Sequence, residues 1–69
     1  MTVIHIREFH WYYADEYIGK SVILHADGYP ITGYDMDKHT IDEVVKEYVE
    51  KNQIKDEIEL EGEYDGKQN

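Results

Sequence analysis

The chain has 69 residues, a length that allows one domain with a thin core. It carries 16 acidic against 7 basic residues, a formal net charge of −9, which argues against direct binding to nucleic acid or to an anionic membrane surface. Without cysteine, neither disulfides nor a cysteine-ligated zinc can supplement the core.

No apolar run approaches the roughly 18 residues that span a membrane, and no basic segment followed by an apolar one opens the chain. Because the sequence begins with Met1, we expect a whole small gene product: a single cytoplasmic domain over residues 1–69. The acidic balance favours basic protein partners, although it can also serve only solubility.

Residues 2–13 read as a first strand, because a β-branched, apolar start leads into alternating aromatic residues. Residues 14–16 would form the turn. The competing interpretation is a short helix, since several aromatic residues also fall at helical spacing. These are Phe9, Tyr12, Tyr13 and Tyr17.

Residues 17–26 read as a second strand, followed by Asp27-Gly28, a strong hairpin-turn signal. Pro30 suits the start of a strand or a sheet edge, so residues 31–34 are expected as a short third strand.

A helix is predicted next. Thr40 is an N-cap and Glu43 stands three residues later, which completes a capping box, and Asn52 is a credible stop. Between them the apolar residues form a single stripe at i, i+3, i+4, i+7 and i+8. These are Ile41, Val44, Val45, Tyr48 and Val49.

Residues 55–64 read as a last strand with one strongly acidic face. Strict alternation puts four glutamates on one side and the apolar residues and Gly62 on the other. Two residues of strand advance about 6.6 Å, close to the ~6.8 Å that two phosphates of one DNA strand advance along the helix axis. The glutamates are Glu57, Glu59, Glu61 and Glu63, and Asp56 and Asp65 extend the row. Residues 65–69 would be a frayed tail.

These elements predict an α+β fold with three strands, one helix and one strand along the chain. The small sheet should be mainly antiparallel, with the helix packed on one face. The other face would be open to solvent or to a partner.

The remaining motifs are weaker indications of a functional site. Asp35, Asp37 and His39 resemble the start of a calcium loop, but the sixth and twelfth positions are Thr40 and Lys46 instead of glycine and glutamate. We therefore expect no metal and no cofactor. The single serine lacks the glycines of a nucleophile elbow, and we expect no enzymatic activity.

The chain resembles the small acidic inhibitors of bacteriophages and mobile elements, which include anti-CRISPR proteins, uracil-DNA glycosylase inhibitors and small inhibitors of host RNA polymerase. The resemblance is one of type. It rests on size, charge and the passage formed by Ile31–Tyr34, Thr40–Glu43 and Glu57–Glu61. It implies a protein of the host cytoplasm that occupies the nucleic-acid site of a larger protein, and no residue roles carry over.

The leading hypothesis is a non-enzymatic inhibitor that mimics phosphate charge and blocks a basic nucleic-acid-binding protein of bacterial defence, repair or transcription. The alternative is a small homodimerising module of phage or antitoxin type whose acidic face confers only solubility. The candidate partner-binding residues are Asp56, Glu57, Glu59, Glu61, Glu63 and Asp65, with Tyr64, Trp11 and Tyr12 as apolar anchors.

Overall fold

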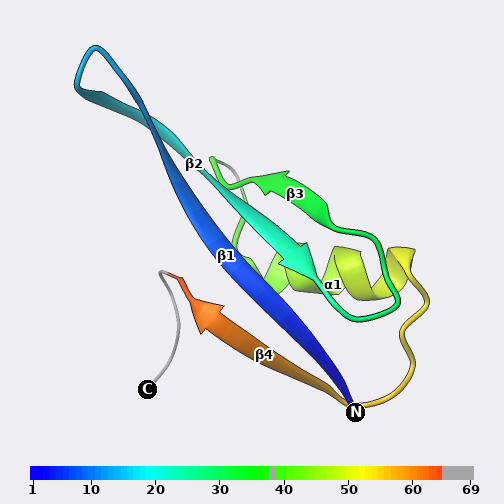
Figure 1. The fold of residues 1–69 in the computed structure, drawn as a ribbon. Helices are drawn as coiled ribbons and strands as arrows, with labels where there is room; N and C mark the ends of the chain where they lie inside the picture. The colour runs from blue at the N-terminus through cyan, green and yellow to red at the C-terminus, as the bar shows by residue number, and fades with distance from the viewer. Residues whose placement is uncertain (38, 65–69) are drawn as a thin grey trace.

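The computed structural model describes residues 1–37 and 39–64. Four strands form one sheet in the order β3-β2-β1-β4, and helix α1 lies across one of its faces (Figure 1). The α+β fold, the element order and the single helix confirm the sequence-based prediction. The elements are β1 (Thr2–Tyr13), β2 (Glu16–His25), β3 (Thr32–Asp35), α1 (Ile41–Lys51) and β4 (Ile58–Glu63).

The sheet is mixed. The β1/β2 and β2/β3 pairs are antiparallel, as expected, whereas β4 pairs in parallel with β1. The parallel pair follows from the connection, because α1 carries the chain from β3 at one edge of the sheet to β4 at the other, and such a crossover permits a parallel neighbour. The position of β4 beside β1 was not predicted.

Strands β1 and β2 form a long hairpin that extends past the helix (Figure 1). Its turn is Ala14-Asp15, with φ of 50° and 67°, the left-handed pair that a two-residue hairpin turn of type I′ requires. We call residues 11–18 the hairpin arm. Because Trp11 pairs with Gly19 and Tyr12 with Tyr17 across the hairpin, the competing helix interpretation is wrong.

The core lies between the sheet and α1. Alternation along β1 and β2 sends every second side chain to this side, and the predicted stripe of α1 meets them. The buried residues are Ile4, Ile6, Val22, Leu24, Ala26, Val44, Val45, Tyr48 and Ile54.

The start of α1 is capped as predicted. The backbone N–H of Glu43 donates to Oγ1 of Thr40 at 3.3 Å, and the backbone N–H of Thr40 donates to Oε1 of Glu43 at 3.1 Å. Donation from the Thr40 backbone is the main cause that lowers the pKa of Glu43. The reciprocal pair satisfies two backbone groups that a bare helix end would leave unbonded.

Tyr48 ties α1 to the connection between β2 and β3. Its side chain is fully buried, and its hydroxyl donates to the carbonyl oxygen of Pro30 at 2.7 Å. The same hydroxyl accepts the backbone N–H of Ala26 at 3.2 Å. One side chain thus satisfies two backbone groups beside the core.

Gly62 allows β4 to lie against β1. Its φ is 139°, and a Cβ atom there would collide with the carbonyl oxygen of Ile6, its partner in β1. Only glycine combines this backbone conformation with so close an approach.

We expect Tyr48→Phe to lower the free energy of unfolding by about 1–3 kcal/mol, because it leaves the Ala26 N–H and the Pro30 carbonyl without their partner. The matched control is Tyr34→Phe. The Tyr34 hydroxyl is buried, has no hydrogen-bond partner within residues 1–37 and 39–64, and has a pKa raised mainly by burial. Its removal should be neutral or stabilising. Denaturant unfolding that ranks the two variants alike would contradict this assignment.

Gly62→Ala should lower the free energy of unfolding by about 2 kcal/mol or more, because the added Cβ would collide with Ile6 and the φ is unfavourable for alanine. Gly33→Ala in β3 is the control, because the nearest atom to its added Cβ would be the carbonyl oxygen of Val22 at an ordinary 3.9 Å. Thermal unfolding compares the two. Equal stability would mean that β4 does not pack as described.

Candidate functional site

Strand β4 presents three exposed glutamates on the face of the sheet opposite α1, and we call Glu59, Glu61 and Glu63 the glutamate row. The alternating residues Leu60 and Gly62 are partly buried on the other side. The predicted inward face is therefore confirmed for Leu60 and Gly62, whereas Ile58, expected on the same face, is 39% exposed. Because β4 is an edge strand, the row lies along a border of the open face.

The neighbouring strand β1 places His5 and Arg7 beside the row. Residue pairing sets His5 opposite Glu61 and Arg7 opposite Glu63. The Nδ1 atom of His5 lies 3.8 Å from Oε1 of Glu61, and the Arg7 guanidinium lies 5.5 Å from the centre of the Phe9 ring. Arg7 thus lies at the inner border of the row, whereas no strand within residues 1–37 and 39–64 pairs with its outer border.

Asp56 has a structural contact of its own. Its Oδ1 accepts the hydroxyl of Thr2 at 2.7 Å, and its Oδ2 lies 3.2 Å from the N-terminal ammonium of Met1. The Thr2 hydrogen bond is the first cause that lowers the pKa of Asp56. The structure therefore places Asp56 at the junction of β1 and β4, apart from the glutamate row.

The remaining candidates near β4 differ in their exposure. The side chain of Glu57 is exposed ahead of β4, while its carbonyl oxygen accepts the backbone N–H of Thr2 at 2.8 Å. Tyr64 is partly buried and packs against the core, so it is not free to act as an exposed anchor. Asp65 lies outside the described residues.

The two aromatic candidates lie on the hairpin arm. Trp11 is 54% exposed and Tyr12 is 63% exposed, and alternation puts them on opposite faces. The Trp11 Nε1–H donates to Oγ of Ser21 at 2.9 Å, which fixes the indole on the open face. Tyr12 packs edge-on against Tyr17 on the other face, with ring centres 5.5 Å apart.

The odd-numbered side chains of β1 form a continuous strip along the open face. We call the residues His5, Arg7, Phe9, Trp11 and Tyr13 the open-face strip. The sequence analysis did not assign His5, Arg7, Phe9 or Tyr13 to the site. The period-2 alternation of β1 could have grouped them, but their position beside the glutamate row depends on the β1/β4 pairing.

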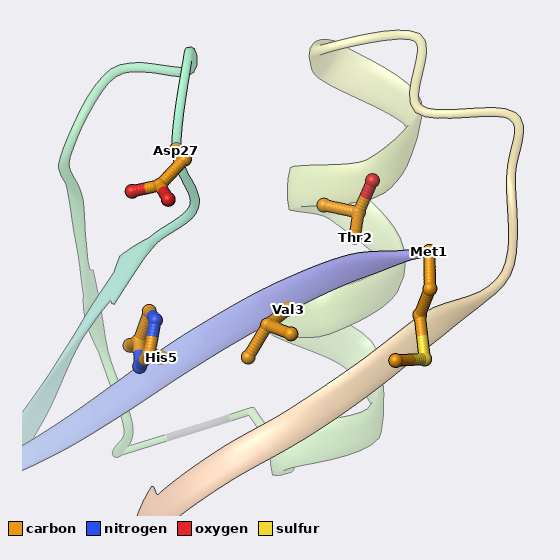
Figure 2. A pocket seen from close by; sticks show the side chains of 5 residues that line it. All are labelled: Met1, Thr2, Val3, His5 and Asp27. Carbon is orange, nitrogen blue, oxygen red and sulfur yellow. The ribbon is translucent and has the colours of Figure 1, made fainter.

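A hollow of about 170 Å³ opens near the start of β1, where Figure 2 shows Met1, Thr2, Val3, His5 and Asp27 around it. Small-molecule pockets usually measure about 300 Å³ or more, so this hollow is small for an organic ligand.

Within residues 1–37 and 39–64, no group of three or more His, Asp or Glu side chains is placed to hold a metal. Asp35 instead accepts the backbone N–H of Asp37 at 3.1 Å, an ordinary turn contact. In the described part of the chain, no helix is long and apolar enough to cross a membrane.

The lowered pKa of Asp56 predicts acid sensitivity. A carboxyl group with a depressed folded-state pKa stabilises the fold above its unfolded pKa, about 3.9, and this stabilisation is lost as the pH falls through the folded value. Asp56→Asn should therefore be less stable than the wild type at neutral pH and should lose less stability below about pH 4. Glu57→Gln, which removes the adjacent charge, should keep the wild-type pH profile. Denaturant midpoints between pH 7 and 2.5 measure this, and identical profiles for wild type and Asp56→Asn would contradict it.

Comparisons with protein-family models, with curated proteins and with solved structures find no match.

Proposed function

We propose that this protein is a non-enzymatic binding protein that presents the glutamate row to a basic protein and competes there with nucleic acid. The observation that carries the proposal is three exposed carboxylates in register on one face of an edge strand. The class of partner would be a nucleic-acid-binding protein of bacterial defence, repair or transcription, such as a CRISPR effector.

Spacing supports the mimicry. Carboxylates two residues apart on a strand repeat every ~6.6 Å, close to the ~6.8 Å that two phosphates of one DNA strand advance along the helix axis. A groove whose Arg and Lys side chains are spaced for phosphates would therefore meet a glutamate at about every second phosphate position. The net charge of −9 would speed encounter with such a groove.

The arrangement also sets the direction of approach. Because Arg7 borders the glutamate row on its inner side, a basic partner is favoured at the outer edge of β4. Among the described residues, no strand pairs with this outer side. A partner groove would therefore receive the edge of the sheet first.

The proposal assigns no catalytic residue. The hydroxyl of the only serine, Ser21, is engaged by the indole of Trp11, and the hollow near Met1 is small. The acidic residues are offered as binding groups, with no nucleophile or acid–base pair among them.

A second candidate function is a self-associating module, and the hairpin arm favours it. The arm exposes between 53% and 76% of each of five large side chains, and exposed aromatic residues are frequent interface anchors. These are Trp11, Tyr12, Tyr13, Tyr17 and Ile18. The two candidate functions predict different oligomeric states for the purified protein: the self-associating module predicts an oligomer, and the nucleic-acid mimic does not require one.

The test is capture from a bacterial lysate by the immobilised protein, followed by elution with duplex DNA or RNA at two salt concentrations. The variant E59Q/E61Q/E63Q should lose the captured basic protein, because it removes the glutamate row at nearly constant size. Wild-type capture should weaken steeply with salt. The matched control D42N/E47Q/E50Q removes as many charges from exposed positions of α1 and should retain capture.

Capture that is insensitive to salt, unaffected by the glutamate variant and not displaced by nucleic acid would overturn the mimicry. Light scattering on the purified protein decides the second candidate. A dimer that the substitution Trp11→Ala converts to a monomer would favour the self-associating module instead.

A further inference from the structure

The aromatic side chains of the open-face strip lie on the same face as the glutamate row. Phe9, Trp11 and Tyr13 continue along β1 beyond Arg7, so the strip changes from charged to aromatic along its length. The hairpin arm carries this aromatic end past the part of the sheet that pairs with β4. The open face thus has an acidic end and an aromatic end.

The exposed rings of the aromatic end are presented outward. Tyr13 is 76% exposed, and Trp11 is 54% exposed while its indole N–H is held by Ser21. A ring fixed in this way offers a face to a partner with little loss of side-chain entropy. Its only polar atom is already bonded, which favours a partner that contacts the π face.

Carboxylates and aromatic faces share one preferred partner, the guanidinium group. It binds carboxylates in a bidentate manner and stacks on aromatic rings. The ammonium group of lysine interacts less well with aromatic rings. The protein already contains the aromatic half of this contact, since the guanidinium of Arg7 lies over the ring of Phe9. The open face is therefore suited to arginine at both of its ends.

We propose that the open face binds an extended, arginine-rich segment of the partner, with guanidinium groups on the glutamate row at one end and on Trp11 and Tyr13 at the other. The inference rests on the proposed function in taking the partner to be basic, and it adds the side chain that is recognised. From His5 to Tyr13 the strip spans about 26 Å, the length of roughly eight extended residues.

Charge complementarity favours this occupant over a second copy of the chain. A second copy would bring another net charge of −9 to the same face. An arginine-rich segment would instead neutralise the glutamate row while it covers the exposed aromatic rings.

The test uses labelled synthetic peptides of about ten residues that alternate serine with arginine, with lysine or with glutamate, and measures binding by fluorescence anisotropy. The arginine peptide should bind best and the glutamate peptide should not bind. W11A and Y13A should each weaken the binding of the arginine peptide about two- to fivefold and should weaken the binding of the lysine peptide less. The matched controls Y12A and Y17A alter the opposite face of the arm and should leave binding unchanged. Circular dichroism checks that each variant is folded.

Equal affinity for arginine and lysine peptides, or equal effects of Y13A and Y12A, would overturn this inference. The proposed function would survive such a result if E59Q/E61Q/E63Q still lost its captured partner. The converse outcome is also possible. If nucleic acid fails to displace the captured protein, the mimicry is refuted. An arginine preference that depends on Trp11 would still uphold the inference.

Discussion

The paired hydrogen bonds of the Tyr48 hydroxyl hold the layers of this protein together. A buried hydroxyl that donates to Pro30 and accepts from Ala26 fixes α1 against the connection between β2 and β3. Neither backbone group belongs to a strand ladder, so without Tyr48 both would lose this partner, and the Ala26 N–H would lose it in the buried core. This contact, together with the apolar stripe of α1, decides which face of the sheet is closed.

Closing one face leaves the other open and the hairpin arm uncovered. Helix α1 has 11 residues and is about 16 Å long, whereas β1 has 12 residues and spans about 40 Å. The helix cannot cover the whole hairpin, so aromatic side chains on both faces of the arm stay exposed. In a chain of 69 residues that has so few large apolar residues for its core, this distribution leaves much of its aromatic surface exposed on the arm.

The open face combines two chemistries that one partner can satisfy. The glutamate row supplies charge along an edge, and the open-face strip supplies aromatic surface on the same side of the sheet. Arg7 stands between them and contacts the ring of Phe9, as an arginine of a partner could do with Trp11 or Tyr13. Both proposals rely on this face, one on the spacing of its carboxylates and the other on the identity of the cation that it prefers.

Local sequence determined most of the fold. The capping box at Thr40, the stripe of α1 and the alternation of β4 are set by residues within a few positions of one another, so they could be predicted from spacing alone. Which strands became neighbours was decided only by the tertiary structure. The parallel pairing of β4 with β1 brings Arg7 beside Glu63 and joins Thr2 to Asp56, residues 54 positions apart, and packing against the core partly buries Tyr64. The Thr2 contact removed Asp56 from the predicted acidic surface, and no local pattern records such a contact because its energy depends on chain closure and packing.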